Sequence, residues 1–472
     1  MALSSITFIF IFIPTFLLLF YILPFSNWRN SVLVLASLIF IAWTDLVNLP
    51  VLICITLFTY TIGMLIGRLV ENKKKVQARA LVWFAVVVNL LPLLFFKYSS
   101  FIVQTMAALA RIEIAYEPKT LPLGISYFTF SAISYLIDVY HATEKPEKNI
   151  IRFSSFLIMF PKFLQGPITR FGQVKTGLIN PKFNLDRMIQ GARRFIAGLA
   201  KKVLLADSLS MLANKILQVD YSELGANLSW VALISYALQI YFDFSGYTDM
   251  ALGLGKMIGL DLPENFNFPY VSRSITDFWR RWHMSLTSWF RTYIFIPLEF
   301  ARKHEKFLRQ QTNILIVFLL TGLWHGASWN FVIWGGYFGL ILAIEASGFG
   351  KILKKAPRLL QHVYTMGVVL LGWVFFRITD IGDWGAFMNA LFGGNGLTSS
   401  VSLQSLMVLF YLPSLFIGIL FCLPLFSSLE KQLETRGVIW RFGFDILYLG
   451  LFILSVSAVL SNGFNAFIYA QF

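Results

Sequence analysis

A histidine lies inside a long apolar stretch of the sequence, where an ionisable side chain is costly. His325 belongs to the segment 313–337, NILIVFLLTGLWHGASWNFVIWGGY, which contains no Asp, Glu, Lys or Arg. A segment of this length can cross a bilayer, and ionisable residues inside such segments usually face a partner or a wet cavity. Gly322 and Gly326 would let another backbone or a substrate approach the imidazole closely. We interpret His325 as the centre of a reaction site; the alternative is a satisfied histidine in a packed core.

A second histidine, His283, lies 42 residues earlier, in a stretch that mixes charged and aromatic residues and reads TDFWRRWH. Asp277 and Arg281 have the i,i+4 spacing of a helical ion pair, with the acid first. Trp279 and His283 have the same spacing and are expected to share a helix face. Arg280 and Arg281 could bind the phosphates of a nucleotide-type donor, because guanidinium groups match phosphate geometry. They could equally anchor lipid phosphates.

Several further polar or amphipathic residues in apolar surroundings are weaker candidates for the site. Trp324 precedes His325, and Ser328 and Asn330 follow it, where they could donate hydrogen bonds to an acyl carbonyl. Asp243 and Gln165 are polar residues in other apolar segments and are candidate substrate or donor ligands. The sequence has no HExxH, P-loop, GxGxxG or GxSxG motif. We therefore expect neither a metal nor a permanently bound cofactor.

The composition indicates a membrane protein. Of the 472 residues, 57% are hydrophobic and 13% are charged, and the mean hydropathy is +0.69. The net charge of +15 comes from basic residues clustered in short loops, which is typical of cytoplasmic loops and of contact with anionic lipids rather than nucleic acid. The two cysteines, Cys54 and Cys422, exclude a disulfide framework and a cysteine-rich metal site.

Apolar runs predict an all-α polytopic membrane protein with about eleven transmembrane helices and additional re-entrant or interfacial helices around a central tunnel. Pro263, Pro269 and the ENFNF segment between them predict a break in the helical pattern, which we interpret as a re-entrant turn. The candidate apolar segments are 6–24, 31–46, 50–67, 80–96, 98–112, 121–140, 153–165, 190–217, 228–254, 312–347, 363–379, 404–426 and 439–461.

No internal repeat or linker divides the chain, so we expect a single membrane domain over residues 1–472. Within it we distinguish N-terminal helices (1–112), a catalytic core (121–347) and C-terminal helices (348–472). The basic loop around Lys73, Lys74 and Lys75 should be cytoplasmic by the positive-inside rule. Counting three spans back from it places the N-terminus outside. The first apolar run has no basic residues before it and no cleavage site after it, so it is expected to be a retained helix and not a signal peptide.

The motifs in several of these segments resemble those of the membrane-bound O-acyltransferases, and within that family the bacterial polysaccharide O-acetyltransferases of the alginate type. DFWRRWHMSL and GLWHGASWNFVIWG are the most specific stretches. The matching segments are LPLGISYFTFSAISYLIDVY (121–140), FPKFLQGPITRF (160–171), FDFSGYTDMALGLGKMIGLDLPENFNFPYVSRSITDFWRRWHMSLTSWFRTYIFIPL (242–298), LLTGLWHGASWNFVIWG (319–335) and FIYAQF (467–472). The chain departs from the family at Lys162, at Gln165 and in the basic stretch that follows IPL.

The resemblance implies that His325 is the catalytic histidine and that His283 is a second functional histidine in the same tunnel. It implies transfer of an acetyl group from a cytoplasmic thioester, with acetyl-CoA as the expected co-substrate, for O-acetylation of an extracytoplasmic polysaccharide such as alginate. The implied location is the bacterial inner membrane, with a periplasmic N-terminus. A separate periplasmic or membrane-anchored acetyltransferase is the implied partner, and it would present the polysaccharide.

Three alternatives remain open from the sequence. The signature is shared with the D-alanyl transfer protein of teichoic-acid modification, so the acyl group could be D-alanyl. The polar residues could instead line the pathway of a transporter for an acyl or sugar carrier, or the chain could be a scaffold in which His325 is dispensable. For the enzyme, His325 could act as a general base, with His283 orienting the donor, or an acetyl group could be held covalently on His325 or on a partner's serine.

Overall fold

The structure, a computed structural model, describes residues 2–462 except 115, 118, 306 and 403–407, and the ordered elements in this part of the chain are helices. FIYAQF (467–472), one of the segments that carries the resemblance, lies outside the described residues. The α-helices are α1 (Ile13–Tyr21), α2 (Ser26–Asp45), α3 (Leu49–Glu71), α4 (Lys75–Leu93), α5 (Ser99–Ala110), α6 (Ile125–Tyr140), α7 (Ile150–Ile158), α8 (Phe171–Ile179), α9 (Leu185–Ala200), α10 (Asp207–Leu217), α11 (Ala226–Met257), α12 (Ile275–Arg281), α13 (Met284–Phe290), α14 (Ile296–Ala301), α15 (Arg309–His325), α16 (Trp329–Ile344), α17 (Gly350–Leu353), α18 (Arg358–Arg377), α19 (Gly382–Leu391), α20 (Val408–Phe421), α21 (Leu425–Glu434) and α22 (Val438–Asn462).

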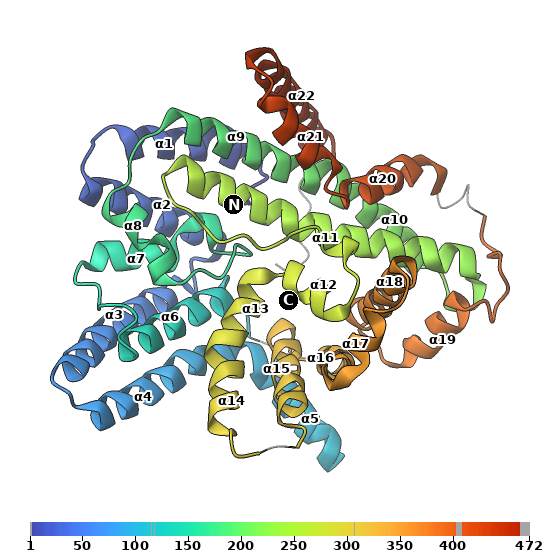
Figure 1. The fold of residues 1–472 in the computed structure, drawn as a ribbon, viewed down its shortest axis with the longest axis horizontal. Helices are drawn as coiled ribbons and strands as arrows, with labels where there is room; N and C mark the ends of the chain where they lie inside the picture. Colours follow the sequence, from blue (N-terminus) through green and yellow to red (C-terminus); the bar gives the residue numbers. More distant parts are fainter. Residues whose placement is uncertain (1, 115, 118, 306, 403–407, 463–472) are drawn as a thin grey trace. The chain divides into compact units, whose positions relative to one another are not determined.

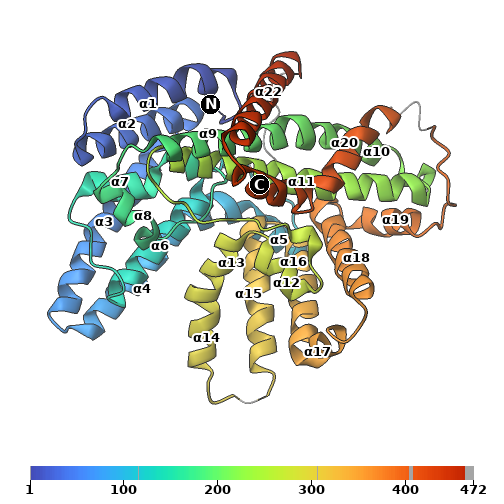
Figure 2. The ribbon, with the colours of Figure 1, turned by 45° about the horizontal axis from the view of Figure 1, so that its top comes forward.

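Contacts divide the chain into two units, the first formed by residues 1–195 and 248–264 and the second by residues 196–247 and 265–472. In the first unit, α3, α4 and α6 pack side by side (Figures 1 and 2). Gly63 permits the approach of α6 to α3, because a Cβ atom there would lie 2.6 Å from the Tyr135 ring. These two units do not test the prediction of a single membrane domain with three parts, which stays a prediction.

In the second unit, α15 and α16 form a closely packed helical hairpin (Figure 1). A Cβ atom on Gly322 would lie 2.2 Å from the Phe331 carbonyl oxygen, and one on Gly335 would lie 2.4 Å from the Phe318 carbonyl oxygen. The predicted span 312–347 is therefore wrong as one helix, because the chain leaves the helical conformation between His325 and Trp329. His325 is the last residue of α15 and lies at the turn of the hairpin.

The predicted break after α11 is present, although whether this segment re-enters the membrane stays a prediction. Between Met257 and Ile275 the described chain forms only one short 3-10 helix, at Pro269–Val271. The following α12 ends at Arg281, and His283 has left-handed backbone angles (φ 45°, ψ 52°) between α12 and α13. The prediction that Trp279 and His283 share a helix face is therefore wrong, since the helix ends before His283.

Five helical segments are long and apolar enough to cross a membrane, and two shorter apolar helices, Phe8–Tyr21 and Val408–Phe421, accompany them in the described part of the chain. The predicted spans 80–96 and 98–112 are joined in one continuous helical segment through a π-helical stretch, so the predicted boundary between them is wrong. The count of about eleven spans stays a prediction. The five segments are Leu49–Glu71, Lys75–Ala110, Trp329–Leu353, Arg358–Arg377 and Val438–Ser461.

Candidate active site

The two histidines singled out in the sequence are linked in the second unit through the indole of Trp324. The ring centroids of Trp324 and His325 are 4.9 Å apart, and those of Trp324 and His283 are 5.8 Å apart. His283 is 1% exposed and His325 is 4% exposed, so both imidazoles are removed from bulk solvent. The structure thus brings together three residues that were predicted as site residues, although they come from two segments of the chain.

His325 is enclosed by aromatic rings from two other helices. Its ring meets Trp334 of α16 at 5.0 Å and Phe376 of α18 at 5.3 Å, both edge to face. Gly326 allows this enclosure, because a Cβ atom there would lie 2.2 Å from the Phe331 ring. The group that lies against Gly326 is therefore a ring of this chain, and the predicted approach of a substrate to the imidazole stays a prediction.

The tautomer of His283 follows from its partner, Asn265. His283 Nδ1 lies 3.0 Å from Asn265 Oδ1, and that oxygen also accepts hydrogen bonds from the backbone N–H (3.2 Å) and hydroxyl (2.9 Å) of Ser285. A backbone N–H can only donate, so the Asn265 atom is the carbonyl oxygen and His283 Nδ1 must carry the hydrogen. The lone pair is then on Nε2, which is buried and has no hydrogen-bond partner among the described residues.

The protonation state of His283, which lies outside the membrane-spanning helices, is set by its surroundings. Burial lowers the pKa of His283 to about 3, because the imidazolium form is poorly solvated there. The Phe244 ring contacts the imidazole edge to face, with 4.7 Å between the ring centroids. His283 is therefore a neutral imidazole at physiological pH, and its free Nε2 is an acceptor for a proton or a hydrogen bond.

Trp279 is linked by ring contacts to the aromatic residues around His325, whereas the neighbouring Arg280 and Arg281 are not. The Trp279 ring meets Trp334 at 5.6 Å, and Trp334 in turn meets His325. Arg281 makes the predicted ion pair with Asp277 (3.0 Å) and also donates to the Asn267 carbonyl at 3.3 Å. Arg280 is exposed.

The remaining predicted site residues have other contacts. Ser328 donates a hydrogen bond to Asn330 Oδ1, and Asn330 Nδ2 donates to the Phe375 carbonyl at 3.4 Å. Asp243 accepts from Lys202 Nζ at 2.7 Å in a buried ion pair. Gln165 is fully buried and belongs to the first unit, whereas both histidines belong to the second.

Glu345, the residue that follows α16, fixes the start of the helix that carries Trp279. Glu345 accepts hydrogen bonds from the backbone N–H groups of Ile275 (2.8 Å) and Thr276 (2.9 Å) and from the Thr276 hydroxyl (2.6 Å). Ser274 caps the same helix by accepting from the Asp277 N–H at 2.9 Å. These bonds satisfy donors that a helix N-terminus leaves unpaired.

A cavity with about 580 Å³ of empty volume opens beside Trp279. Its walls come from α12, α13, α15 and the π-helical segment Arg291–Phe295, and they are mostly apolar. Arg291, which is exposed, is the charged residue of the lining.

Sequence reasoning missed Asn265, Phe244 and Trp334. Asn265 was noticed only as part of a helix-breaking ENFNF segment, and Trp334 only as part of a family motif. Their roles depend on contacts across the tertiary structure, which residue spacing does not indicate. Among the described residues, no cluster of three or more His, Cys, Asp or Glu side chains could hold a metal ion.

Comparison with known proteins identifies the family. Residues 123–380 match the model of the membrane-bound O-acyltransferase family. The chain is 39% identical over 386 residues to the probable alginate O-acetylase of Azotobacter vinelandii, covering 81% of this chain and 76% of the relative. It is 31% identical over 431 residues to a peptidoglycan O-acetyltransferase of Helicobacter pylori (83% and 80% covered). It is 28% identical over 340 residues to a teichoic acid D-alanyltransferase of Bacillus subtilis (70% and 84% covered).

The part of the chain that matches the family model contains His283, Trp324 and His325. The helical fold with several membrane-length apolar helices agrees with this assignment. The chain therefore belongs to the membrane-bound O-acyltransferase family and is a multi-pass membrane O-acyltransferase.

Proposed function

We propose that this chain transfers an acetyl group from a cytoplasmic thioester, with acetyl-CoA as the donor, for O-acetylation of an extracytoplasmic polysaccharide such as alginate. The observation that carries the proposal is the pair of buried histidines joined through Trp324, because acyl transfer to a hydroxyl needs a base in a site protected from water. The similarity to O-acetyltransferases of two different polymers supports acetyl as the transferred group.

In the proposed reaction His325 is the general base. It takes the proton from the acceptor hydroxyl as that oxygen attacks the thioester carbonyl, which forms the C–O bond and a tetrahedral oxyanion. The C–S bond then breaks, and the leaving thiolate recovers the proton from the imidazolium. His283, neutral with its Nε2 lone pair free, orients the donor by accepting a hydrogen bond.

The oxyanion needs a hydrogen-bond donor, and we propose Trp334 for this role. Its ring contacts His325, and its indole N–H is buried with no acceptor among the described residues. Buried polar groups are rarely left unpaired, so an unused donor at a reactive centre calls for an explanation. Ser328 and Asn330 were the sequence candidates for this role, but they are hydrogen-bonded to each other.

The donor enters, in this proposal, through the cavity beside Trp279. Its apolar walls would hold the pantetheine arm, and Arg291 would meet the phosphates of the nucleotide portion. In this proposal Arg291 binds the phosphates, in place of Arg280 and Arg281, which the sequence suggested for that role. Arg281 is already engaged by Asp277 and the Asn267 carbonyl.

The setting proposed for this reaction is the bacterial inner membrane, with a periplasmic N-terminus and lipid around the apolar helices. We propose that a periplasmic or membrane-anchored acetyltransferase receives the acetyl group and delivers it to the polymer. The partner would supply the domain that recognises the polymer outside the membrane.

Acetyl transfer by purified protein in nanodiscs tests the proposal. Radiolabelled acetyl-CoA, and D-alanyl donors as a comparison, are supplied to wild type, His325→Ala and the control His304→Ala, an exposed histidine. We expect donor turnover by wild type and His304→Ala and none by His325→Ala. Preference for the D-alanyl donor would redirect the substrate assignment toward the teichoic-acid relatives. Turnover retained in His325→Ala would exclude His325 as the base.

A further inference from the structure

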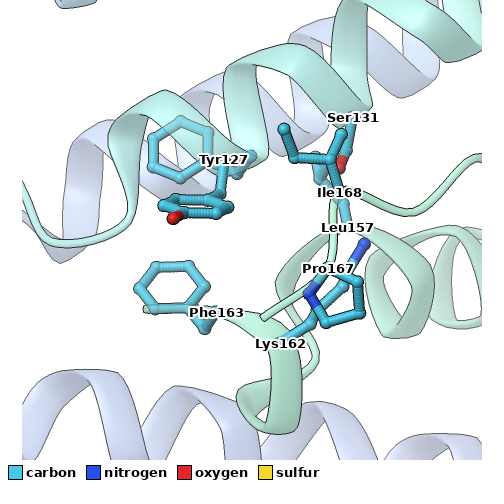
Figure 3. A pocket seen from close by; sticks show the side chains of 8 residues that line it. Tyr127, Ser131, Leu157, Lys162, Phe163, Pro167 and Ile168 are labelled. Atoms are coloured by element: carbon cyan, nitrogen blue, oxygen red, sulfur yellow. The ribbon is translucent and has the colours of Figure 1, made fainter. Parts of the chain in front are cut away.

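Lys162 is a buried lysine that the proposed reaction does not use. Its side chain lies beside a small pocket and extends toward Leu157 and Ser131 (Figure 3). Only 5% of the residue is exposed, and the pocket admits little more than a water-sized group. This amine is closed to ligands, so a partner of opposite charge can meet only the exposed basic side chains of the protein.

A turn in the second unit gathers exposed positive charge. It runs from α17 into the start of α18 (residues 351–360), and we call it the basic turn. None of its basic side chains forms an ion pair or a hydrogen bond with a described residue. The described part of the chain therefore does not compensate this charge. The basic side chains, all exposed, are Lys351, Lys354, Lys355 and Arg358.

The carboxylates near the basic turn are engaged by other groups. Glu345 accepts hydrogen bonds from the backbone at the start of α12. Glu299 is paired with Arg309 at 3.0 Å, at the start of α15. Gln311 donates a hydrogen bond to the Ser347 hydroxyl at 3.1 Å, which joins this part of α15 to the chain just before α17. Both carboxylates thus have partners, and the charge of the basic turn is available for a partner outside the chain.

Hydrogen bonds hold the backbone of the basic turn in one conformation. The Gln361 side chain donates to the Ala356 carbonyl at 2.9 Å and to the Lys354 carbonyl at 3.4 Å. The Ala356 N–H donates to the Leu353 carbonyl at 3.1 Å. Pro357 restricts the backbone directly before α18. The charges are therefore preorganised, which lowers the entropy cost of binding a partner.

Large aliphatic side chains lie among these charges in the sequence and are also exposed. Ile352 is 67% exposed, Leu359 is 72% exposed and Leu360 is 58% exposed. Basic side chains next to exposed apolar ones are typical of a membrane interface, where the cations meet lipid headgroups and the apolar groups enter the acyl-chain region. A free phosphate ion would leave these three aliphatic side chains in water.

The basic turn also lies where a membrane surface is expected. It joins two segments that are long and apolar enough to cross a membrane, Trp329–Leu353 and Arg358–Arg377. Only residues 354–357 lie between them, so the charges cannot extend far from the lipid headgroups. Because α17 follows the end of α16, the basic turn lies at the opposite end of the hairpin from His325 (Figure 2).

We propose that the basic turn binds the phosphate groups of anionic phospholipids, whose acyl chains cover Ile352, Leu359 and Leu360. Each lysine or arginine near an anionic membrane surface strengthens binding by a factor of about 5. A lipid accounts for the charge, for the aliphatic side chains and for the position between two membrane-length segments. An acidic protein would account for the first two observations but not for the third. The inference does not depend on the acyl-transfer reaction.

A lipid titration of the full-length protein in neutral detergent tests the proposal. Phosphatidylglycerol is added, and the unfolding temperature is followed by tryptophan fluorescence, because a ligand that binds the folded state stabilises it. The variant combines Lys351→Gln, Lys354→Gln and Lys355→Gln. The matched control combines Lys73→Gln, Lys74→Gln and Lys75→Gln, which removes the same charge from another exposed loop.

We expect a saturable rise of the unfolding temperature in wild type and in the control. The basic-turn variant should bind phosphatidylglycerol on the order of 100-fold more weakly, since three cations are lost. All three proteins should unfold at the same temperature without lipid, because the replaced side chains are exposed. Equal lipid affinity of the basic-turn variant and wild type would overturn the proposal. An equal loss in both variants would also overturn it, since the effect would then come from net charge and not from this site.

Three further ligands and one further variant separate a lipid from other anions. Phosphatidylcholine, glycerol phosphate and a polyglutamate peptide should each have little effect on the unfolding temperature. Ile352→Gln combined with Leu359→Gln keeps the charge and should weaken phosphatidylglycerol binding by about 10-fold, because two aliphatic side chains no longer enter the acyl-chain region.

A response to glycerol phosphate as strong as the response to phosphatidylglycerol would assign the site to a free phosphate and overturn the lipid proposal. A stronger response to polyglutamate would assign the surface to an acidic protein, with the same consequence. Unchanged lipid affinity of the aliphatic variant would contradict the contact with acyl chains.

Discussion

His283 donates a hydrogen bond from Nδ1 to the side-chain oxygen of Asn265, 3.0 Å away, and this bond leaves the lone pair on Nε2. Ser285 fixes the orientation of the Asn265 amide by donating to the same oxygen. The chemistry available to His283 therefore depends on a residue 18 positions earlier, in the irregular segment between α11 and α12.

Asn265→Ala should lower kcat for acetyl transfer by about 10²-fold or more, because the imidazole can then rotate or adopt the other tautomer. Asn265→Asp keeps the acceptor and adds a negative charge, which raises the pKa of His283 and should shift the acid limb of the pH–rate profile to higher pH. Steady-state kinetics across pH 5 to 9 separate the two variants. Equal activity of wild type and Asn265→Ala would contradict a positioning role for Asn265.

Trp334→Phe should preserve the ring packing around His325 while it removes the indole N–H. If that N–H stabilises the oxyanion, kcat should fall by about 10²-fold with little change in KM, because the hydrogen bond forms mainly in the transition state. Single-turnover acetyl transfer measures this effect. Phe338→Leu, a packing change beside Trp334, is the control, and a similar loss of kcat there would point to packing and not to the donor.

Glu345→Ala should destabilise the protein by about 2–4 kcal/mol, since it removes the acceptor of three hydrogen bonds at the start of α12. Ser274→Ala, which removes only the N-cap of the same helix, should cost about 1 kcal/mol. Thermal unfolding in detergent, followed by tryptophan fluorescence, ranks the two variants. The reverse order would show that Glu345 does not hold α12.

Gly322→Leu should separate α15 from α16, because even a Cβ atom at that position meets the Phe331 carbonyl oxygen at 2.2 Å. We expect a loss of about 3 kcal/mol or more and inactive protein. Gly336→Leu is the matched control, since a Cβ atom there would come no closer than 3.8 Å to Leu319. Yield of monodisperse protein and the unfolding temperature measure the difference. Equal behaviour of the two variants would contradict the close hairpin.

Lys162→Met should stabilise the protein near pH 6 by on the order of 3 kcal/mol, because it removes a buried ammonium. The native pKa lies below that of an exposed lysine, so between pH 7 and about 10 the unfolded chain binds more protons than the native chain. Wild-type stability should therefore rise with pH across this window, and the advantage of the methionine variant should shrink. Unfolding at pH 6, 8 and 9.5 measures the trend; a constant difference would contradict a buried, titrating amine.

Features that arise from neighbouring residues could be predicted from the sequence alone. Apolar runs predicted a helical membrane protein, and the prolines and asparagines near Asn265 predicted the break after α11. The i,i+4 spacing predicted the Asp277–Arg281 ion pair. The family motifs pointed to an O-acyltransferase, and the family match confirmed it. These features were accessible because helix formation, helix breaking and i,i+4 contacts act over a few residues.

How these elements meet could not be predicted from the sequence and is visible only in the folded chain. The tertiary structure split the segment around His325 into a hairpin, ended α12 before His283, and placed Trp324 between the two imidazoles. It also supplied Asn265 as the partner of His283 and left the amine of Lys162 in an apolar pocket. Such contacts join residues far apart in the chain, and their geometry depends on the packing of whole helices, which the local pattern of residues does not specify.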